Sequence, residues 1–253
     1  MSTPFAGRTA LVTGGGNGLG RAIALALARH GAQVIVTGRA SSKLAAVAGE
    51  IGPSGRWLVC DTSSPAAVSA LAATVADVSI LVNNAGIAGP VAPLVDVEVA
   101  DWDEVFAVNV RGVYLMCQAF LPGMIARGRG DIINLASVSG KRPLARRTPY
   151  TASKMAVIGL TATLAHEVGP LGISVNTLSP GPVEGPRMER NFRLEAERTG
   201  ATVEQARAEF VGRAALRRMV TEDEVAAAAV AMLQMPGLCG ADIDLSAGMI
   251  ARS

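Results

Sequence analysis

Short apolar segments alternate with longer helical patterns along most of the chain. The short segments are rich in Val, Ile and Leu, which is typical of strands that are buried on both faces. A regular alternation of such strands with helices indicates a parallel sheet covered by helices on both sides. We therefore predict an α/β, doubly wound fold with a seven-stranded parallel sheet. The predicted strands are residues 9–13, 33–37, 57–60, 79–83, 131–137, 173–179 and 242–246.

One segment breaks this alternation. Residues 181–213 are rich in Arg and Glu and lie between the sixth predicted strand and the next helical pattern. The chain of 253 residues has no internal repeat and no low-complexity linker, and its length suits a single α/β domain. We predict one domain over residues 1–253, in which residues 181–213, here called the lid, form an insertion that covers a substrate.

Composition and charge exclude several classes of protein. Hydrophobic residues make up 50% of the chain, and the net charge is only +2. Aromatic residues amount to 4%, which disfavours a nucleic-acid binder with stacking aromatics and basic clusters. The apolar run at 225–233 is much shorter than the roughly 20 residues of a membrane span, and no secretory signal is visible at the start of the chain. We expect a cytoplasmic protein that binds neither nucleic acid nor membrane.

Cysteine and histidine are too few and too scattered for a metal site. Cys60, Cys117 and Cys239 show no C-x-x-C spacing, so we interpret them as reduced thiols in the core. His30 and His166 are the only histidines and are expected to be structural. No metal is predicted.

A glycine-rich turn follows the first predicted strand. Residues 13–20 read TGGGNGLG and lead into a helical pattern. Glycines at such a turn let backbone N–H groups and the positive end of the helix face a phosphate. The spacing is G-x-x-x-G-x-G rather than G-x-G-x-x-G, and three glycines could serve backbone conformation alone. We predict a Rossmann-type dinucleotide site that includes Gly14, Gly16, Asn17, Gly18, Leu19 and Gly20.

The end of the second predicted strand lacks the acidic residue that usually accepts hydrogen bonds from the ribose of NAD. Gly38 occupies that position and Arg39 follows it. An arginine forms a charge-assisted pair with a 2′-phosphate, which an aspartate would repel. NADP(H) is therefore favoured. NAD(H) stays possible, because Arg39 could be a solvated loop residue and Asn17 stands where a second basic residue would have helped.

The third predicted strand ends in CDTS, which contains Asp61 and Thr62. Asp61 is placed to accept a hydrogen bond from an adenine amine, and Thr62 is grouped with it as a cofactor contact. Asp61 could equally cap the helix that follows. The sequence leaves these two interpretations open.

Several motifs in a fixed order resemble the short-chain dehydrogenase/reductase family, in its branch of about 250 residues. They are TGGGNGLG at 13–20, NNAG at 83–86, Asn109 in FAVNVRG, Ser137 in NLASVSG, YTASK at 150–154 and SPGPV at 179–183. The resemblance covers nearly the whole chain. It implies an NAD(P)-dependent oxidoreductase that interconverts a secondary alcohol and a ketone.

Tyr150 and Lys154 lie four residues apart, which on a helix places both side chains on one face. The resemblance implies that Tyr150 is the general acid/base and that Lys154 lowers its pKa and holds the nicotinamide ribose, so both also bind the cofactor. Ser137 is implied to bind the substrate oxygen, and Asn109 to hold a water of the proton relay.

The remaining cofactor contacts also follow from the resemblance. In NNAG, they are Asn83, Asn84, Ala85 and Gly86, although Asn83 could instead tie strands together. In SPGPV, they are Pro180 and Gly181 along the nicotinamide and the backbone of Val183 at its carboxamide. The family often has Thr two residues after that last position, where Glu184 and Gly185 follow Val183 in this chain.

Three alternatives stay open. The enzyme could use NAD(H) with the same chemistry, the chain could be a non-catalytic binding protein of this fold, or it could be an epimerase or dehydratase of the extended branch. The resemblance further implies a homotetramer that is built through helices near 103–120 and 150–169 and the C-terminal strand.

The substrate is expected to be a small alcohol or ketone. Arginines at 142, 146 and 147 and in the lid at 187, 190 and 193, together with Lys141, border the predicted pocket. One or two of them could clamp an anionic group on the substrate. Alternatively they are solvated or pair with acidic residues, for which Glu184, Glu189 and Glu195 are candidates.

Overall fold

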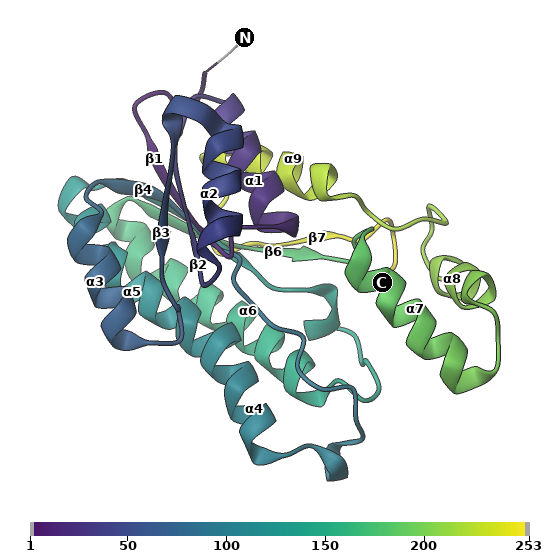
Figure 1. Ribbon diagram of the computed structural model, residues 1–253. Helices are drawn as coiled ribbons and strands as arrows, with labels where there is room; N and C mark the ends of the chain where they lie inside the picture. Colours follow the sequence, from purple (N-terminus) through teal and green to yellow (C-terminus); the bar gives the residue numbers. More distant parts are fainter. Residues whose placement is uncertain (1–2, 251–253) are drawn as a thin grey trace.

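The computed structural model describes residues 3–250, without the side chain of Arg187. Seven parallel strands form one sheet in the order β3-β2-β1-β4-β5-β6-β7, which confirms the predicted fold class (Figure 1). The predicted strand ends are right to within two residues. The strands are β1 (Thr9–Thr13), β2 (Gln33–Gly38), β3 (Gly55–Val59), β4 (Val78–Asn83), β5 (Gly130–Leu135), β6 (Ile173–Pro180) and β7 (Asp242–Leu245).

Helices cover both faces of the sheet (Figure 1). One face packs against α1, α2 and α9, and the other against α3, α5 and α6. The longer helices are α1 (Gly18–Arg29), α2 (Ser41–Ile51), α3 (Pro65–Thr74), α4 (Val99–Phe106), α5 (Gly112–Arg127), α6 (Thr148–Val168), α7 (Pro186–Thr199), α8 (Val203–Val211) and α9 (Glu222–Leu233).

The two apolar layers explain why the strands read as continuous hydrophobic runs. Successive side chains of a strand point to opposite faces. In β1, Ala10 and Val12 enter the core under α1 and α9, whereas Leu11 enters the core under α5 and α6. Both faces of the strand are therefore buried, and a polar residue on either face would be costly.

The strand order reverses between β1 and β4, which are neighbours in the sheet. In open parallel sheets, ligands bind in the crevice at the carboxyl ends of the strands beside such a reversal. The glycine turn follows β1 and the NNAG segment follows β4. The topology thus brings two segments that are about 70 residues apart in sequence to the same crevice.

A continuous helical stretch runs through α4, the π-helical turn Ala107–Arg111 and α5. Within the 29 residues Val99–Arg127, a window of 18 residues has a mean hydropathy of 1.3, so by length and composition alone this stretch also suits a membrane span. Half of that window is buried against the rest of the protein, as expected of a core helix. Met116 and Met124 are fully buried beneath the sheet.

Within the lid, residues 186–211 form the two helices α7 and α8, which project beyond the carboxyl end of β6 (Figure 1). The rings of Phe192 and Phe210 meet edge to face with centroids 5.5 Å apart and hold the two helices together. The insertion is therefore a small helical unit, and its role as a cover over a substrate stays a prediction.

The cysteine prediction is wrong for one residue. Cys60 and Cys117 are buried free thiols, as expected, but Cys239 is exposed. It lies in the turn between α9 and β7, where Gly240 adopts a positive φ and the chain runs along the surface.

Candidate active site

The glycine turn is shaped by close backbone contacts. Gly14 and Gly18 have positive φ angles of 63° and 54°, which glycine adopts without steric cost. A Cβ on Gly20 would lie 2.3 Å from Gly14 O and 2.5 Å from Asn84 Nδ2, so no side chain fits there. Asn17 precedes α1 without capping it through its side chain. The first N–H groups of α1 therefore have no side-chain cap.

Thr13 and Asn84 fasten this turn to the NNAG segment. Thr13 Oγ1 accepts hydrogen bonds from Asn84 N at 3.0 Å and Ala85 N at 2.9 Å. Asn84 Nδ2 donates to Thr13 O at 2.9 Å and to Gly14 O at 3.3 Å. The two predicted cofactor segments thus form one rigid unit. Asn84 binds the glycine turn through its side chain and so has a structural role. Thr13 is the first residue of the TGGGNGLG motif, but it was not predicted as a site residue.

The end of β2 has no carboxylate, and two cationic side chains lie near it. A Cβ on Gly38 would meet only Leu44 Cδ2 at 3.7 Å and Gly14 Cα at 3.9 Å, so the position faces open space beside the glycine turn. Arg39 is exposed. Lys43, in the first turn of α2, has its Cβ 3.1 Å from the position of a Gly16 Cβ. Lys43 is thus a second cation beside the turn, which no local pattern in the sequence indicates.

Asp61 lies at the end of β3 and does not cap a helix. Its Oδ1 accepts from Ser63 N at 2.9 Å and from Ser63 Oγ at 2.7 Å, and these bonds hold the pKa of the carboxyl below its usual value. Ser64 is the residue that caps α3, through Ala67 N at 3.3 Å. The capping interpretation of Asp61 is wrong, because the chain makes one more turn before the helix begins.

Thr62 and Asn83 are both buried among protein groups. A Cβ on Gly112 would lie 3.0 Å from Thr62 Oγ1, so Thr62 packs against the start of α5. Asn83 Nδ2 donates to Asn134 Oδ1 on the neighbouring strand at 2.9 Å. Asn83 therefore ties β4 to β5, as the structural alternative proposed, and its contact with a cofactor stays a prediction.

Tyr150 and Lys154 lie in the first two turns of α6. The Lys154 side chain is 5% exposed, and its Nζ lies 5.9 Å from the centroid of the half-buried Tyr150 ring. Lys154 Nζ donates to Leu135 O at 2.8 Å, at the end of β5. A Cβ on Gly86 would lie 3.1 Å from Asn109 Oδ1 and 3.5 Å from this ammonium, so the last residue of NNAG packs closely against both side chains. A cation is thus held beside the phenol ring and next to the predicted cofactor segment.

Asn109 holds the start of α6 in place through Ser153. Its Oδ1 accepts from Ile87 N at 2.8 Å, and its Nδ2 donates to Ile87 O and to Ser153 Oγ, each at 3.0 Å. Ser153 Oγ in turn donates to Tyr150 O at 2.7 Å. The side chain of Asn109 is therefore committed to protein partners, and a water that it helps to hold would contact its backbone. Ser153 is a supporting residue that the sequence analysis overlooked.

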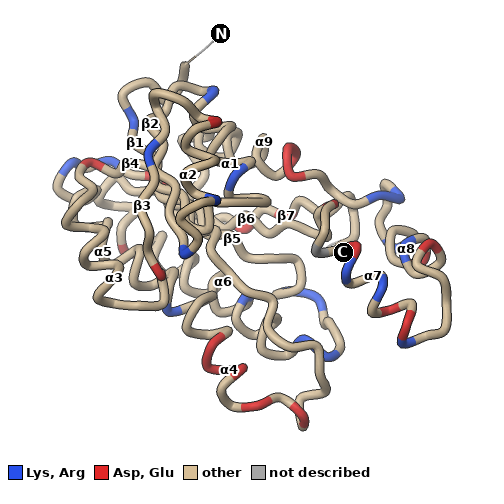
Figure 2. Tube along the Cα trace, viewed as in Figure 1, with Lys and Arg blue, Asp and Glu red and all other residues tan. Residues whose placement is uncertain are grey.

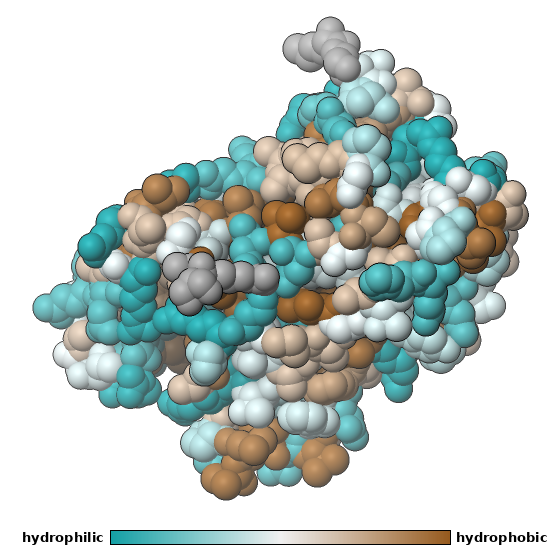
Figure 3. Space-filling model, turned by 180° about the vertical axis from the view of Figure 1, so that it is seen from behind, coloured by the Kyte–Doolittle hydropathy of each residue, from teal (hydrophilic) through white to brown (hydrophobic). Residues whose placement is uncertain are grey.

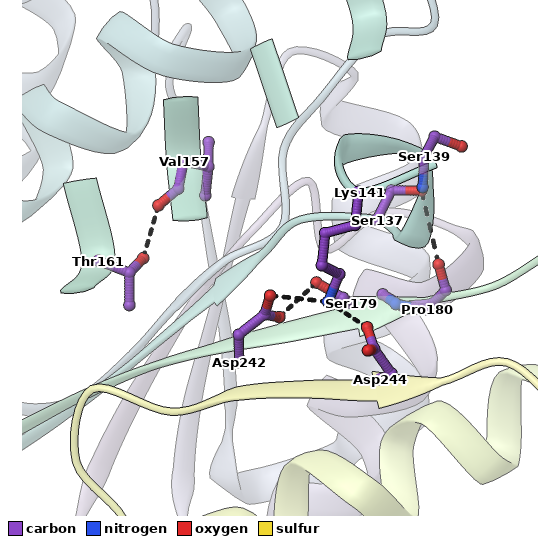
Figure 4. A network of polar contacts seen from close by, with 9 residues as sticks. All are labelled: Ser137, Ser139, Lys141, Val157, Thr161, Ser179, Pro180, Asp242 and Asp244. Carbon is purple, nitrogen blue, oxygen red and sulfur yellow. Dashed lines mark hydrogen bonds and ion pairs between the residues drawn. The ribbon is translucent and has the colours of Figure 1, made fainter. Parts of the chain in front are cut away.

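Ser137 lies at the turn that follows β5. Its Oγ accepts from Ser139 N at 3.1 Å and lies 3.5 Å from Pro180 O, to which it donates (Figure 4). A Cβ on Gly140 would lie 3.1 Å from the backbone of Lys154 and Met155, so this turn packs directly on α6. Ser137 thus lies between the carboxyl end of β6 and the helix that carries Tyr150.

The SPGPV segment is anchored by its neighbours. Gly181 N donates to Leu245 O at 2.7 Å, and a Cβ on Gly181 would lie 2.8 Å from Ser246. Val183 pairs with Val220 in a parallel bridge that uses Pro182 O and Glu184 N. The N–H and C=O groups of Val183 itself take no part in this bridge. They are therefore available for the predicted backbone contact with a cofactor.

Figure 2 shows basic residues on α7 and in the loop before α6, on either side of the predicted pocket. By their side-chain contacts, the arginines of these segments fall into two groups. Arg146 donates to Val91 O, and Arg147 to Ala88 O and Gly89 O, so these two fasten loops. Arg142, Arg190 and Arg193 make no side-chain hydrogen bond or ion pair within residues 3–250. The side chain of Arg187 lies outside the described part of the structure.

The acidic residues of the lid pair with other arginines than those expected. Glu189 pairs with Arg207 at 3.2 Å and Glu195 with Arg198 at 2.6 Å. The second pair lowers the pKa of Glu195, mainly through the hydrogen bond from Arg198. Two of the three candidate partners, Glu189 and Glu195, are therefore already engaged with other arginines.

These residues fit a nicotinamide dinucleotide. Close packing at Gly14 and Gly20 fixes the shape of the glycine turn, and α1 begins there with N–H groups that no side chain caps, as a phosphate site requires. Gly38, Arg39 and Lys43 would surround an adenosine ribose, and Tyr150 and Lys154 a nicotinamide ribose. Within the described residues, no cluster of three or more metal-binding side chains is present.

Comparison with known proteins agrees with this geometry. The chain matches the family described as short chain dehydrogenase over residues 8–197. A dehydrogenase/reductase SDR family member 6 from Danio rerio is 37% identical over 221 residues, 87% of either chain. NAD+-bound xylitol dehydrogenase superimposes with a TM-score of 0.91 at 30% identity and covers 97% of this chain and 100% of that one. A variant of actinorhodin polyketide ketoreductase with NADPH gives 0.90 at 32% identity and covers 98% and 99%.

Proposed function

The chain belongs to the short-chain dehydrogenase/reductase family and is an oxidoreductase of that family, and we propose that it interconverts a secondary alcohol and a ketone with a nicotinamide dinucleotide. One observation carries the proposal: the buried Lys154 ammonium lies beside the Tyr150 ring on one face of α6. A buried cation next to a phenol is costly for a purely structural helix, and it is useful where a phenolate must form.

The proposed chemistry assigns one task to each side chain. A phenol with a pKa near 10 is a weak base at neutral pH, and the Lys154 charge favours its ionised form. In alcohol oxidation, Tyr150 takes the hydroxyl proton, while Ser137 Oγ binds the same oxygen and orients it. In the reverse direction, Tyr150 returns the proton to the carbonyl oxygen. The bound nicotinamide supplies or accepts the hydride.

NADP(H) is the proposed preference. The end of β2 has Gly38 in place of a ribose-binding carboxylate, and two exposed cations, Arg39 and Lys43, lie beside it. Both would attract a 2′-phosphate. The two structural relatives hold NAD+ in one case and NADPH in the other, so the preference rests on these residues of the chain itself.

An anionic substrate is a finer proposal. Of the arginines that border the predicted pocket, Arg146 and Arg147 bind backbone oxygens. Arg142, Arg190 and Arg193 have no side-chain partner among residues 3–250. Guanidinium groups without carboxylate partners are suited to clamp a carboxylate or phosphate on a hydroxy or oxo compound. Arg190→Ala should then raise KM for an acidic substrate and leave a neutral analogue almost unaffected.

The reaction is tested by a screen of secondary alcohols and ketones with NAD(H) and NADP(H), followed at the absorbance of the reduced nicotinamide. Tyr150→Phe removes the acid/base but keeps the ring, so turnover should fall at least a hundredfold while NADPH binding stays within about threefold. Tyr114, the other tyrosine of the chain, is the matched control, because it lies exposed on α5. Tyr114→Phe should keep full turnover.

Two results would count against the proposal. Activity of Tyr150→Phe within tenfold of wild type, or ~1.4 kcal/mol, would remove Tyr150 as the acid/base. Wild-type protein that binds NADPH but turns over no compound in the screen would favour the alternative of a binding protein with this fold.

A further inference from the structure

A partly buried cluster of charges joins the Ser137 turn to the edge strand β7 (Figure 4). Lys141 Nζ donates to Asp242 Oδ2 at 2.7 Å and also to Asp244 Oδ1. The side chains of Lys141, Asp242 and Asp244 are only 13%, 15% and 20% exposed. At this burial, water and salt screen the ion pairs much less than at an open surface.

The contacts around this cluster close into a ring. Ser179 Oγ donates to Asp242 Oδ1 at 2.7 Å, and the next residue, Pro180, accepts from Ser137 Oγ. Ser137 and Lys141 are the two ends of one short turn, in which Gly140 N donates to Ser137 O at 2.9 Å. The side chain that binds the substrate oxygen in the proposed mechanism and the lysine that binds β7 therefore belong to one rigid turn.

The turn is held on two opposite sides. On one side, Gly140 lies against the backbone of Lys154 and Met155, where there is no room for a Cβ. On the other side, Lys141 is bound to β7, a strand of four residues that pairs only with β6. Without the lysine, the turn would keep its contact with α6 and the long bond from Ser137 Oγ to Pro180 O on β6, but it would lose its attachment to β7.

The two carboxylates need the cation between them. Asp242 and Asp244 are two residues apart on one strand, so their side chains lie on the same face. Like charges this close and this poorly solvated repel each other once the lysine charge is removed. The strand that carries them would then shift relative to Ser179 and Pro180.

We propose that Lys141 is a positioning residue, which holds Ser137 at its working distance from Tyr150 by binding Asp242 and Asp244. The proposal rests on the proposed function, because it concerns the serine of that mechanism. It predicts that loss of Lys141 slows the chemical step without weakening the binding of NADPH.

The test uses the full chain and compares Lys141→Met with Arg8→Met. Arg8 forms the matched ion pair, with Asp131 Oδ2 at 2.5 Å and an exposed fraction of 7%, at the opposite end of β5 from Ser137. Amide hydrogen exchange of residues 136–142, kcat, and NADPH binding are measured for both. Lys141→Met should speed exchange in this segment and lower kcat, each at least tenfold, with NADPH affinity within twofold of wild type. Lys141→Arg should restore both.

Arg8→Met should lower the melting temperature but leave that exchange and kcat within twofold. If Lys141→Met and Arg8→Met show the same hydrogen exchange in residues 136–142 and the same kcat, the proposal is overturned. If Lys141→Met does not fold, Asp244→Asn replaces it, and unchanged exchange in residues 136–142 of that variant would overturn the proposal as well. A wild type without turnover would reject the proposed function alone, since hydrogen exchange still decides whether Lys141 holds the turn.

Discussion

At the scale of single residues, the end of β2 decides which dinucleotide fits. The position that would carry a carboxylate for the ribose hydroxyls is Gly38, and the surrounding charges are positive. A guanidinium and an ammonium attract a phosphate at this place, whereas one aspartate would repel it. The choice of cofactor therefore depends on very few atoms.

Exchange of these residues should change the cofactor preference. Gly38→Asp has room for its side chain, since a Cβ there meets nothing closer than 3.7 Å, and it should shift the preference toward NAD(H). Arg39→Ala and Lys43→Ala should each weaken the binding of NADPH about tenfold, or ~1.4 kcal/mol, and leave the binding of NADH unchanged. Arg56→Ala, at the amino end of β3, is the control. Fluorescence titration measures the NADPH and NADH affinities of the four variants and of the wild type. A wild type that prefers NADH would contradict the assignment.

The three thiols should differ in reactivity. Burial and the nearby Asp61 charge raise the pKa of Cys60 to about 11, and burial raises the pKa of Cys117 to about 12. A raised pKa keeps both groups as unreactive thiols below pH 10, because only the thiolate attacks. Iodoacetamide at pH 8 should therefore modify the exposed Cys239 of the native protein first. Mass spectrometry of the digest identifies the site, and labelling of Cys60 at the rate of Cys239 would refute this.

At the scale of elements, the turn between β1 and α1 is a part of the chain that tolerates few side-chain substitutions. Backbone of the turn and the Asn84 amide approach Gly20 within the distance of a single Cβ. The cost of any larger residue is displacement of backbone rather than of a flexible side chain. The same contacts that shape the predicted phosphate site therefore also stabilise the fold.

Two glycine substitutions separate these effects. Gly20→Ala should force Gly14 and Asn84 apart, lower stability by about 1–3 kcal/mol and weaken NADPH at least tenfold. Gly49→Ala, on the exposed face of α2, meets no atom within 4 Å and should stabilise by about 0.5–1 kcal/mol without changing NADPH binding. Thermal unfolding and NADPH titration measure both. Equal affinities of the two variants would show that the turn does not hold the cofactor.

At the scale of the whole molecule, exposed apolar side chains include two groups that could take part in assembly. One lies on the helices that cover the sheet, with Tyr114 on α5 and Met155 on α6 each 47% exposed. The other is the tip between β4 and α4, where Leu94 and Val95 are exposed; Figure 3 shows this tip as an apolar group at the lower end of the molecule. Exposed apolar groups on two packed helices suit contact with another copy of the chain.

The proposed homotetramer should bury the α5 and α6 faces. Light scattering at micromolar concentration should give about four times the chain mass of 25.9 kDa. Tyr114→Glu places a charge in the interface and should lower the mass, whereas Leu171→Glu, which is beyond the end of α6, should not. A monomeric mass for the wild type would exclude this assembly.

Local chemistry explains what the sequence predicted correctly. The central strands are buried on both faces and are therefore apolar throughout, so short apolar runs mark their places along the chain. The edge strands β3 and β7 are more exposed but were also recognised as short apolar runs. Glycine is required where a Cβ has no room, as at Gly14 and Gly20, and is favoured where φ is positive, as at Gly18, which is why the turn is visible as a motif. The four-residue spacing of Tyr150 and Lys154 places both on one face of any helix. These features leave a mark in the local sequence, although the contacts of Asn84 at Gly14 and Gly20 come from a distant segment.

Other features were decided only by tertiary structure, because they depend on contacts between distant segments. Lys43 reaches the glycine turn only because β2 pairs with β1, and Asp61 misses the helix cap because the chain turns once more before α3. The bonds of Lys141 cross 101 and 103 residues of sequence. They exist because β7 pairs with β6 in the register that places Asp242 and Asp244 beside Thr177 and Ser179. No local pattern encodes that register, so a lysine that the sequence places in a basic loop forms, in the folded protein, ion pairs with two carboxylates of the edge strand.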